Sequence, residues 1–209
     1  MQALCPLCAT LGKVYYESKD TYYKCPKCYG VFADEKNKPN KIEEKQRYEL
    51  HDDDTNDSGY RKFVNPITSS ITNDFTPKSK GLDFGAGTSA IISVVLHEQN
   101  YNIKNYDPYF HKYPELLEDK YDYISSCEVI EHFYKPCKEF TLLKRMLKKD
   151  AKLYLMSEVY DEKIDFASWY YKNDPTHVFF YSKETFEWIK NNFGFKTVSI
   201  NKKLIVLEN

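Results

Sequence analysis

The stretch that decides the fold is Lys80-Gly81-Leu82-Asp83-Phe84-Gly85-Ala86-Gly87-Thr88-Ser89. Residues 81–84 predict a short buried strand, and the glycines that follow predict a tight turn. Apolar side chains at helical spacing over residues 91–96 predict a helix, and residues 101–106 predict a second strand that ends at Asp107. The segment is therefore one βαβ unit, which places the fold in the α/β class.

This unit has the features of a nucleotide site. Its glycine-rich turn lets the backbone approach a ligand, and Asp107 follows Gly87 by twenty residues. A carboxylate after the second strand can accept hydrogen bonds from ribose hydroxyls. However, Gly85-x-Gly87-x-x-Ala90 also satisfies the dinucleotide fingerprint, so this unit alone leaves the type of nucleotide cofactor open.

Two further observations reduce this ambiguity. Asp83 completes the pattern Asp-x-Gly-x-Gly, and residues 121–132 end in Cys127-Glu128-Val129-Ile130-Glu131-His132. These stretches resemble motif I and the fourth strand of class I S-adenosylmethionine-dependent methyltransferases. The resemblance covers most of residues 80–209 and is closest to small bacterial relatives of the ubiquinone and sugar methyltransferases, some with an N-terminal zinc ribbon. The chain after Asp107 is also too short for the rest of an NAD oxidoreductase.

The resemblance implies a Rossmann-like sheet whose last strand runs antiparallel. The residues themselves predict a buried strand at 151–156, a helix capped by Ser182 and stopped by Gly194, and a closing hairpin of strands at 196–200 and 204–207, in the order of this sheet. The resemblance also implies that S-adenosylmethionine contacts Asp83, Phe84, Gly85, Ala86, Gly87, Asp107, Pro108, Tyr109, Cys127 and Glu128.

Three departures from the family pattern stand out. Ser89 replaces a third glycine, and Lys149-Asp150-Ala151 replaces a Pro-Gly-Gly turn. About a dozen residues separate Asp107 from the fourth strand. The family's third strand, with its adenine-binding acid, is therefore expected to be shortened or absent.

Two histidines are candidate bases, because methyl transfer to a hydroxyl requires removal of a proton. His132 follows the predicted fourth strand, and His177 lies in the long connection 158–181. We predict both as catalytic, in an acceptor pocket that also contains Trp169 and Tyr170. The alternatives are that His132 only orients its loop and that the aromatic residues form a small separate core.

Two cysteine pairs, Cys5-Pro-Leu-Cys8 and Cys25-Pro-Lys-Cys28, are separated by sixteen residues. Two such knuckles can supply four thiolates to a tetrahedral zinc ion, and the residues between them predict a hairpin. We predict a zinc ribbon over residues 1–33, with a structural metal bound by Cys5, Cys8, Cys25 and Cys28. Disulfides, a redox dithiol and rubredoxin-type iron are the alternatives. Cys127 and Cys137 are expected to be ordinary buried cysteines.

Residues 34–78 lie between the ribbon and the predicted methyltransferase core at 79–209. They are polar, with predicted helices at 41–50 and 60–64. This segment is either a linker or a cover over the cofactor cleft. The cover is suggested by side chains more specific than a spacer requires, namely Arg47, Tyr48, His51, Tyr60, Arg61 and Phe63.

Composition narrows the function further. The net charge of −1 and the isoelectric point near 6.5 argue against a strongly basic nucleic-acid-binding protein. No apolar run is long enough to span a bilayer, and no signal peptide is visible, so we expect a cytoplasmic protein. The predicted function is methyl transfer from S-adenosylmethionine to a small molecule. An RNA methyltransferase that grips RNA with the ribbon and a non-catalytic cofactor-binding scaffold are the alternatives.

Overall fold

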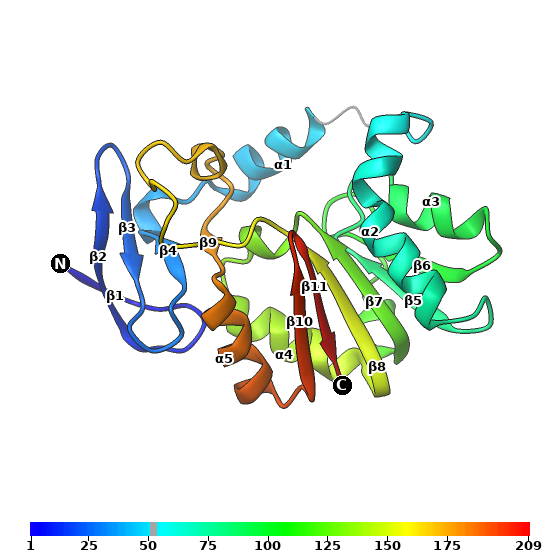
Figure 1. Cartoon of the computed structure of the whole chain (residues 1–209). Helices are drawn as coiled ribbons and strands as arrows, with labels where there is room; N and C mark the ends of the chain where they lie inside the picture. Colours follow the sequence, from blue (N-terminus) through cyan, green and yellow to red (C-terminus); the bar gives the residue numbers. More distant parts are fainter. Residues whose placement is uncertain (51–53) are drawn as a thin grey trace.

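The computed structural model describes residues 1–50 and 54–209, so His51 of the connecting segment lies outside the described residues. Figure 1 shows two sheets joined side by side, with the connecting segment passing over them. The larger sheet has the order β10-β11-β8-β7-β5-β6. Its strands are β5 (Lys80–Phe84), β6 (Asn102–Tyr106), β7 (Tyr121–Cys127), β8 (Leu147–Met156), β10 (Thr197–Asn201) and β11 (Leu204–Glu208).

Strands β5, β6, β7 and β8 run parallel, whereas β11 is antiparallel to both β8 and β10. The predicted α/β class and the antiparallel closing hairpin are therefore confirmed. Strand β6 forms one edge of this sheet. Within the described residues, the chain between β6 and β7 forms a short 3-10 helix, η2 (Pro114–Glu118), and no further strand of this sheet. The expected loss of the third strand is thus confirmed.

Helices cover both faces of the larger sheet. On one face, α2 (Ser58–Asp74) and α3 (Ile91–His97) pack in one apolar cluster with strand residues such as Tyr123 and Tyr154. On the other, α4 (Pro136–Met146) and α5 (Lys183–Phe193) pack against Ile124 and Leu153. The alternation of neighbouring strand residues between these clusters follows from the two-residue period of a strand.

The helix boundaries follow local capping chemistry. The Ser182 side chain accepts a hydrogen bond from the Thr185 amide at 3.2 Å, and Gly194 ends α5 with a φ of +73°. Both are as predicted. Helix α2 is longer than the predicted 60–64, because Asp57 caps its first turn and the helix continues through Pro66. None of the described helices is long and apolar enough to cross a bilayer.

The smaller sheet consists of β1 (Gln2–Leu4), β2 (Leu11–Glu17), β3 (Thr21–Lys24), β4 (Val31–Ala33) and β9 (Phe179–Phe180). The predicted hairpin is the β2–β3 pair. Strand β9 comes from the long connection after β8 and pairs with β4, with Phe180 opposite Val31. Gly30 is required here because a Cβ atom would lie 2.3 Å from the Phe179 ring. Residues 1–33, called the ribbon, and the long connection after β8 therefore form one packed unit.

Candidate active site

A cavity of about 1020 Å³ opens at the carboxyl ends of β5, β6 and β7. This is the edge where ligands bind in open parallel sheets. Every residue predicted to contact the cofactor lines it, as do both predicted histidines. The lining set thus includes Asp83, Phe84, Gly85, Ala86, Gly87, Asp107, Pro108, Tyr109, Cys127, Glu128, His132 and His177.

The glycine-rich turn has a backbone that side chains would disturb. Gly85 and Gly87 have φ values of +79° and +64°, in the left-handed region that favours glycine. A Cβ atom at Gly85 would lie 2.5 Å from Val129, whereas none would meet a neighbour within 4 Å at Gly87. Gly85 therefore serves both the turn and its close approach to the loop after β7.

Asp107 ties the glycine-rich turn to the end of β6. Its Oδ2 atom accepts a hydrogen bond from the Gly87 amide at 3.1 Å. Its Oδ1 atom accepts from the amides of Tyr109 at 2.8 Å and Phe110 at 3.0 Å. These bonds fix a carboxylate at the cavity wall.

Asp83 is a buried acid beneath the same turn. The Ser125 hydroxyl donates a hydrogen bond to its Oδ1 atom at 2.9 Å. Burial, with a smaller contribution from the Asp107 charge, raises the pKa of Asp83 to about 7. The side chain can therefore carry a proton near neutral pH while the cavity is empty.

Glu128 turns the chain sharply at the end of β7. Its φ is +51°, and its amide donates to the carbonyl of Met156 at 2.7 Å. The Tyr171 hydroxyl lies 3.0 Å from Glu128 Oε2, while Oε1 is buried and has no hydrogen bond to any described residue. Burial, together with the nearby Glu131 charge, raises the pKa of Glu128 to about 8.

The two histidines meet in the cavity. Their ring centroids are 4.7 Å apart. His132 Nδ1 lies 3.0 Å from the carbonyl oxygen of Thr176, and His177 Nδ1 lies 2.7 Å from that of Tyr171. Because a carbonyl only accepts, each neutral ring carries its proton on Nδ1 and its lone pair on Nε2. Burial lowers the pKa of His177, which favours this neutral form.

Glu131 completes this cluster, although the sequence reasoning did not select it. It is fully buried, its side chain accepts hydrogen bonds from the Tyr171 and Ser157 hydroxyls, and its backbone carbonyl accepts from Val178. The signal in the sequence was the run Glu128-Val129-Ile130-Glu131-His132, in which two carboxylates and a histidine follow a buried strand. A buried carboxylate is unusual and calls for partners.

The connecting segment contributes to the cavity wall through α1 (Lys41–Glu49). The Tyr109 hydroxyl donates to Glu44 at 2.6 Å, and Arg47 donates to Asp174 at 2.8 Å. The Tyr48 ring lies 5.3 Å from the His132 ring, edge to face. Tyr60 and Phe63 of α2 also line the cavity. Helix α1 therefore bridges the cofactor side and the histidine side.

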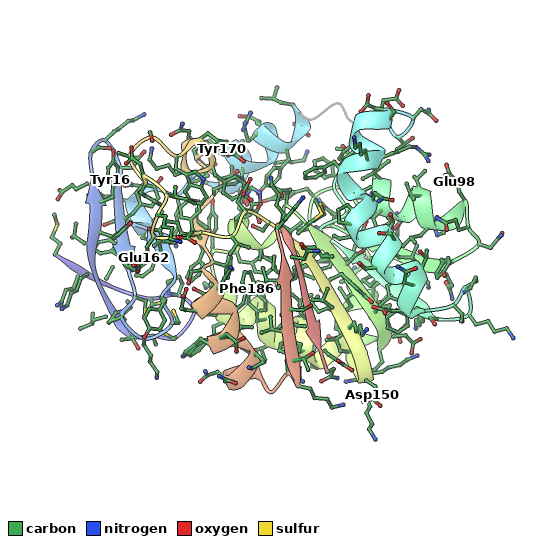
Figure 2. All side chains as sticks on the ribbon, viewed as in Figure 1. Tyr16, Glu98, Asp150, Glu162, Tyr170 and Phe186 are labelled. Carbon is green, nitrogen blue, oxygen red and sulfur yellow. The ribbon has the colours of Figure 1, made fainter. Side chains whose placement is uncertain are left out.

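Trp169 does not line the cavity, so its predicted place in the acceptor pocket is wrong. It packs with Tyr160, Phe166 and Phe180 in an aromatic cluster between the long connection and the ribbon. Tyr171, two residues on, takes the place beside the histidines. Tyr170 lines the cavity as predicted, is 62% exposed, and is labelled in Figure 2.

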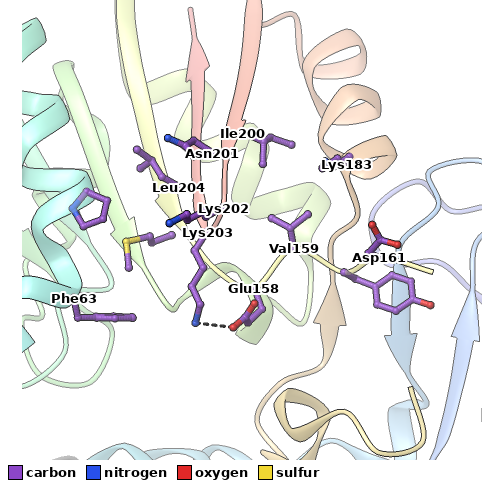
Figure 3. Close-up of a pocket in the computed structure, with 13 residues that line it drawn as sticks. Phe63, Glu158, Val159, Asp161, Lys183, Ile200, Asn201, Lys202, Lys203 and Leu204 are labelled. Carbon is purple, nitrogen blue, oxygen red and sulfur yellow. Dashed lines mark ion pairs between the residues drawn. The ribbon is translucent and has the colours of Figure 1, made fainter. Parts of the chain in front are cut away.

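A second hollow of about 870 Å³ lies beside the first, and Phe63 lines both. Figure 3 shows the ion pair in it between Lys203 and Glu158, whose atoms are 2.7 Å apart. The Tyr170 hydroxyl also donates to Glu158, at 2.5 Å. This pair thus lies at the boundary between the two hollows.

The four cysteines of the two knuckles lie close enough together to share one metal ion. The Sγ atoms of Cys5 and Cys28 are 3.5 Å apart, those of Cys8 and Cys25 are 3.3 Å apart, and all four lie within 4.8 Å of one another. Thiolates around zinc at about 2.3 Å would be roughly 3.8 Å apart, so the set fits the metal. By contrast, Cys137 is exposed on α4, so its predicted burial is wrong.

Comparison with known proteins agrees with this geometry. A sequence-family model described as a methyltransferase domain matches residues 53–200. No protein of curated function matches the chain in sequence.

Several solved structures are similar in fold. Magnesium protoporphyrin IX methyltransferase from Synechocystis, with bound S-adenosylhomocysteine, is 13% identical over 81% of this chain and 94% of its own, with a TM-score of 0.53. Human N-acetylserotonin methyltransferase, in complex with S-adenosylmethionine, is 10% identical over 72% and 53%, with a TM-score of 0.54. An O-methyltransferase family protein from Burkholderia thailandensis is 8% identical over 71% and 56%, with a TM-score of 0.51.

At these identities the likeness concerns the fold, and the chain spans little more than half the length of the last two proteins. The match to the family model concerns the sequence as well as the fold. The matched residues, 53–200, include the glycine-rich turn, Asp107 and the loop after β7. The chain belongs to the methyltransferase-domain family, with the sheet of the class I S-adenosylmethionine-dependent enzymes.

Proposed function

We propose that this protein transfers a methyl group from S-adenosylmethionine to a hydroxyl group of a small molecule. One observation carries this proposal. A single cavity is lined by the glycine-rich turn, by Asp107 and by two neighbouring histidines. A proposed donor site and a pair of candidate bases thus share one cavity.

The donor would lie along the carboxyl edge of the sheet. Asp107 would accept hydrogen bonds from the ribose hydroxyls, and the turn at Gly85 and Gly87 would contact the amino-acid part. Cys127 and Glu128 line the same cavity at the end of β7. This orientation would place the sulfonium methyl group toward His132 and His177.

The protein need not form a covalent bond to either substrate, because the methyl group of the sulfonium is already activated for displacement. The acceptor oxygen forms a bond to the methyl carbon as the carbon–sulfur bond breaks, and S-adenosylhomocysteine leaves. Alignment of the acceptor oxygen, the methyl carbon and the sulfur atom can account for much of the rate acceleration. The lone pair on Nε2 of His132 or His177 would take the hydroxyl proton, for which the observed Nδ1 contacts prepare each ring.

A small acceptor is favoured over RNA by the way the cavity is covered. Helix α1 crosses it, joined to both sides by the Glu44–Tyr109 and Arg47–Asp174 contacts. A covered cavity suits a small ligand, whereas RNA would need an open basic face. The net charge of −1 shows no overall excess of basic side chains for such a face. The candidate bases also speak for an enzyme rather than a scaffold.

The ribbon would have a structural role. Cys5, Cys8, Cys25 and Cys28 would fill all four positions of a zinc ion, which leaves none open for substrate. Bound zinc would hold the small sheet together and, through the β4–β9 pair, brace the connection that carries His177. We accordingly divide the chain into the ribbon at 1–33, the connecting segment at 34–78 and the methyltransferase core at 79–209.

Titration calorimetry tests the donor directly. We expect S-adenosylhomocysteine to bind one site per chain and NAD to give no heat of binding. Binding of NAD, or of neither ligand, would contradict the proposal. Metabolite profiling of cells with and without the protein would then identify the acceptor as a compound whose methylated form requires the protein.

A further inference from the structure

We propose that Glu131, His132 and His177 form a binding site for a divalent transition-metal ion, separate from the cysteine site of the ribbon. One ring nitrogen of each histidine and a carboxylate oxygen of Glu131 all lie within 4.8 Å of one another. Ligand atoms at about 2.1 Å from a metal are roughly 3.0–3.4 Å apart in octahedral or tetrahedral geometry. The limit of 4.8 Å includes this spacing, so the three side chains lie near enough to share one ion.

The contacts around the histidines are those of metal ligands. A histidine that binds a metal through one nitrogen almost always donates its other N–H to a carbonyl or carboxylate. Here the Nδ1 atoms of both rings face backbone carbonyls, of Thr176 at 3.0 Å and Tyr171 at 2.7 Å. This arrangement fixes Nε2 as the nitrogen with the lone pair in each neutral ring.

The backbone holds these ligands together although they come from distant parts of the chain. Glu131 and His132 lie on the 3-10 helix η3 (Ile130–His132), directly after β7. The Val178 amide donates to the Glu131 carbonyl at 2.9 Å, which fixes the segment of His177 beside η3. The Ser157 hydroxyl orients the Glu131 carboxylate at 3.1 Å. Such support for each ligand is expected of a built metal site.

The charges in this region also favour a cation. Glu128 and Glu131 both contact the Tyr171 hydroxyl, which has only one proton to donate. Glu128 Oε1 is buried without a hydrogen bond to any described residue. The positive charge of Lys203 stabilises the ionised form of Glu128, but Lys203 forms its ion pair with Glu158. A bound dication would compensate two buried carboxylates, which are otherwise costly.

The ligand set indicates the class of ion. Two imidazoles and one carboxylate suit Zn²⁺, Mn²⁺, Fe²⁺ or Co²⁺, whereas Mg²⁺ and Ca²⁺ prefer oxygen ligands. Three protein ligands leave positions open for another molecule. The role of the ion rests on the proposed methyl transfer: it would bind the acceptor oxygen and lower the pKa of its hydroxyl group. With both Nε2 lone pairs on the ion, the hydroxyl proton would pass to water instead of to a histidine, and the oxygen would then attack the methyl carbon as the carbon–sulfur bond breaks.

Cobalt titration tests the site without any methyl transfer. The full-length protein, with zinc in the ribbon, is passed over a chelating resin and titrated with Co²⁺. We expect one further equivalent to bind, with visible d–d absorption and without thiolate-to-cobalt charge transfer. His177→Ala and Glu131→Gln should each weaken this binding by at least about tenfold. The matched control is His97→Ala, which removes an exposed histidine at the end of α3.

The two proposals fail in different ways. No cobalt binding beyond the ribbon, equal affinity in His177→Ala and the wild type, or thiolate bands from exchange into the ribbon would each overturn the metal site. S-adenosylhomocysteine titration on the same samples verifies the fold of each variant and tests the donor site independently. Should Glu131→Gln not fold, His177→Gln replaces it, because His177 is only half-buried at the cavity wall.

Discussion

The rings of His132 and His177 lie 4.7 Å apart, at an interplanar angle of 70°, although they belong to different connections of the sheet. A hydrogen bond between Val178 and the Glu131 carbonyl, at 2.9 Å, joins those connections. Both rings face the cavity that the glycine-rich turn also lines. This pairing brings the candidate chemistry to the donor site, and it leads to the first prediction.

His177→Ala should lower turnover by about 10²–10⁴-fold while leaving the affinity for S-adenosylhomocysteine within about twofold. The reason is that His177 is proposed to act on the acceptor and not on the donor. Single-turnover kinetics and calorimetry on the same preparation measure both quantities. Unchanged turnover would remove His177 from the reaction.

Asp107→Ala should weaken S-adenosylhomocysteine binding by on the order of 1.5–3 kcal/mol, because hydrogen bonds to a charged carboxylate are lost. Asp107→Asn keeps one acceptor oxygen for ribose or backbone donors and should lose less. Calorimetry measures both, with Glu187→Ala on the exposed face of α5 as the control. If the affinity is unchanged, or if a ribbon variant such as Cys8→Ser weakens it more, the ribose acid lies elsewhere.

Alanine at the two glycines of the turn should have unequal effects. Gly85→Ala combines a left-handed φ with a clash against Val129, so we expect it to destabilise the protein by about 3 kcal/mol or more. Gly87→Ala meets no neighbour and should cost only about 1 kcal/mol. Urea unfolding compares the two. Adding Val129→Ala should restore part of the loss at Gly85, and equal losses at both glycines would contradict this account.

Asp83 should make the cofactor-free protein less stable as the pH rises. Because burial raises its pKa to about 7 in the folded state, it holds a proton there that the unfolded chain has already released. Its contribution to stability is therefore lost as the pH rises through 7. Relative to Asp83→Asn, the wild type should lose about 2 kcal/mol of unfolding free energy between about pH 5.5 and 8.5. Parallel pH profiles in urea unfolding would refute this.

Removal of the ribbon metal should disturb the long connection. We expect one equivalent of zinc per chain, bound by Cys5, Cys8, Cys25 and Cys28, before any cobalt is added. Chelation should shift the tryptophan emission to longer wavelength, because Trp169 lies in the aromatic cluster against the ribbon. Trp169→Phe, which leaves Trp188, should lack this shift. Iron in elemental analysis, or disulfides in the native protein, would contradict the zinc assignment.

The sequence by itself determined the βαβ unit, the antiparallel closing hairpin and the pairing of the cysteine knuckles. These features depend on local rules: residue periodicity, glycine at positive φ, capping at Ser182 and the spacing of thiolates. The missing third strand could also be predicted, because too few residues separate Asp107 from β7 to form it. All residues that the family resemblance implied as cofactor contacts line the cavity. They do so because the motifs that carry the resemblance lie at the carboxyl ends of β5, β6 and β7.

Only the tertiary structure decided how the long connection is used. Its aromatic residues look alike in sequence, yet Trp169 packs against the ribbon while Tyr171 joins Glu128 and Glu131. The choice depends on the β4–β9 pairing, a contact between distant segments that no local pattern specifies. The Glu131–His132–His177 cluster has the same origin: its members are brought together by packing, and packing energies depend on the whole fold rather than on neighbouring residues.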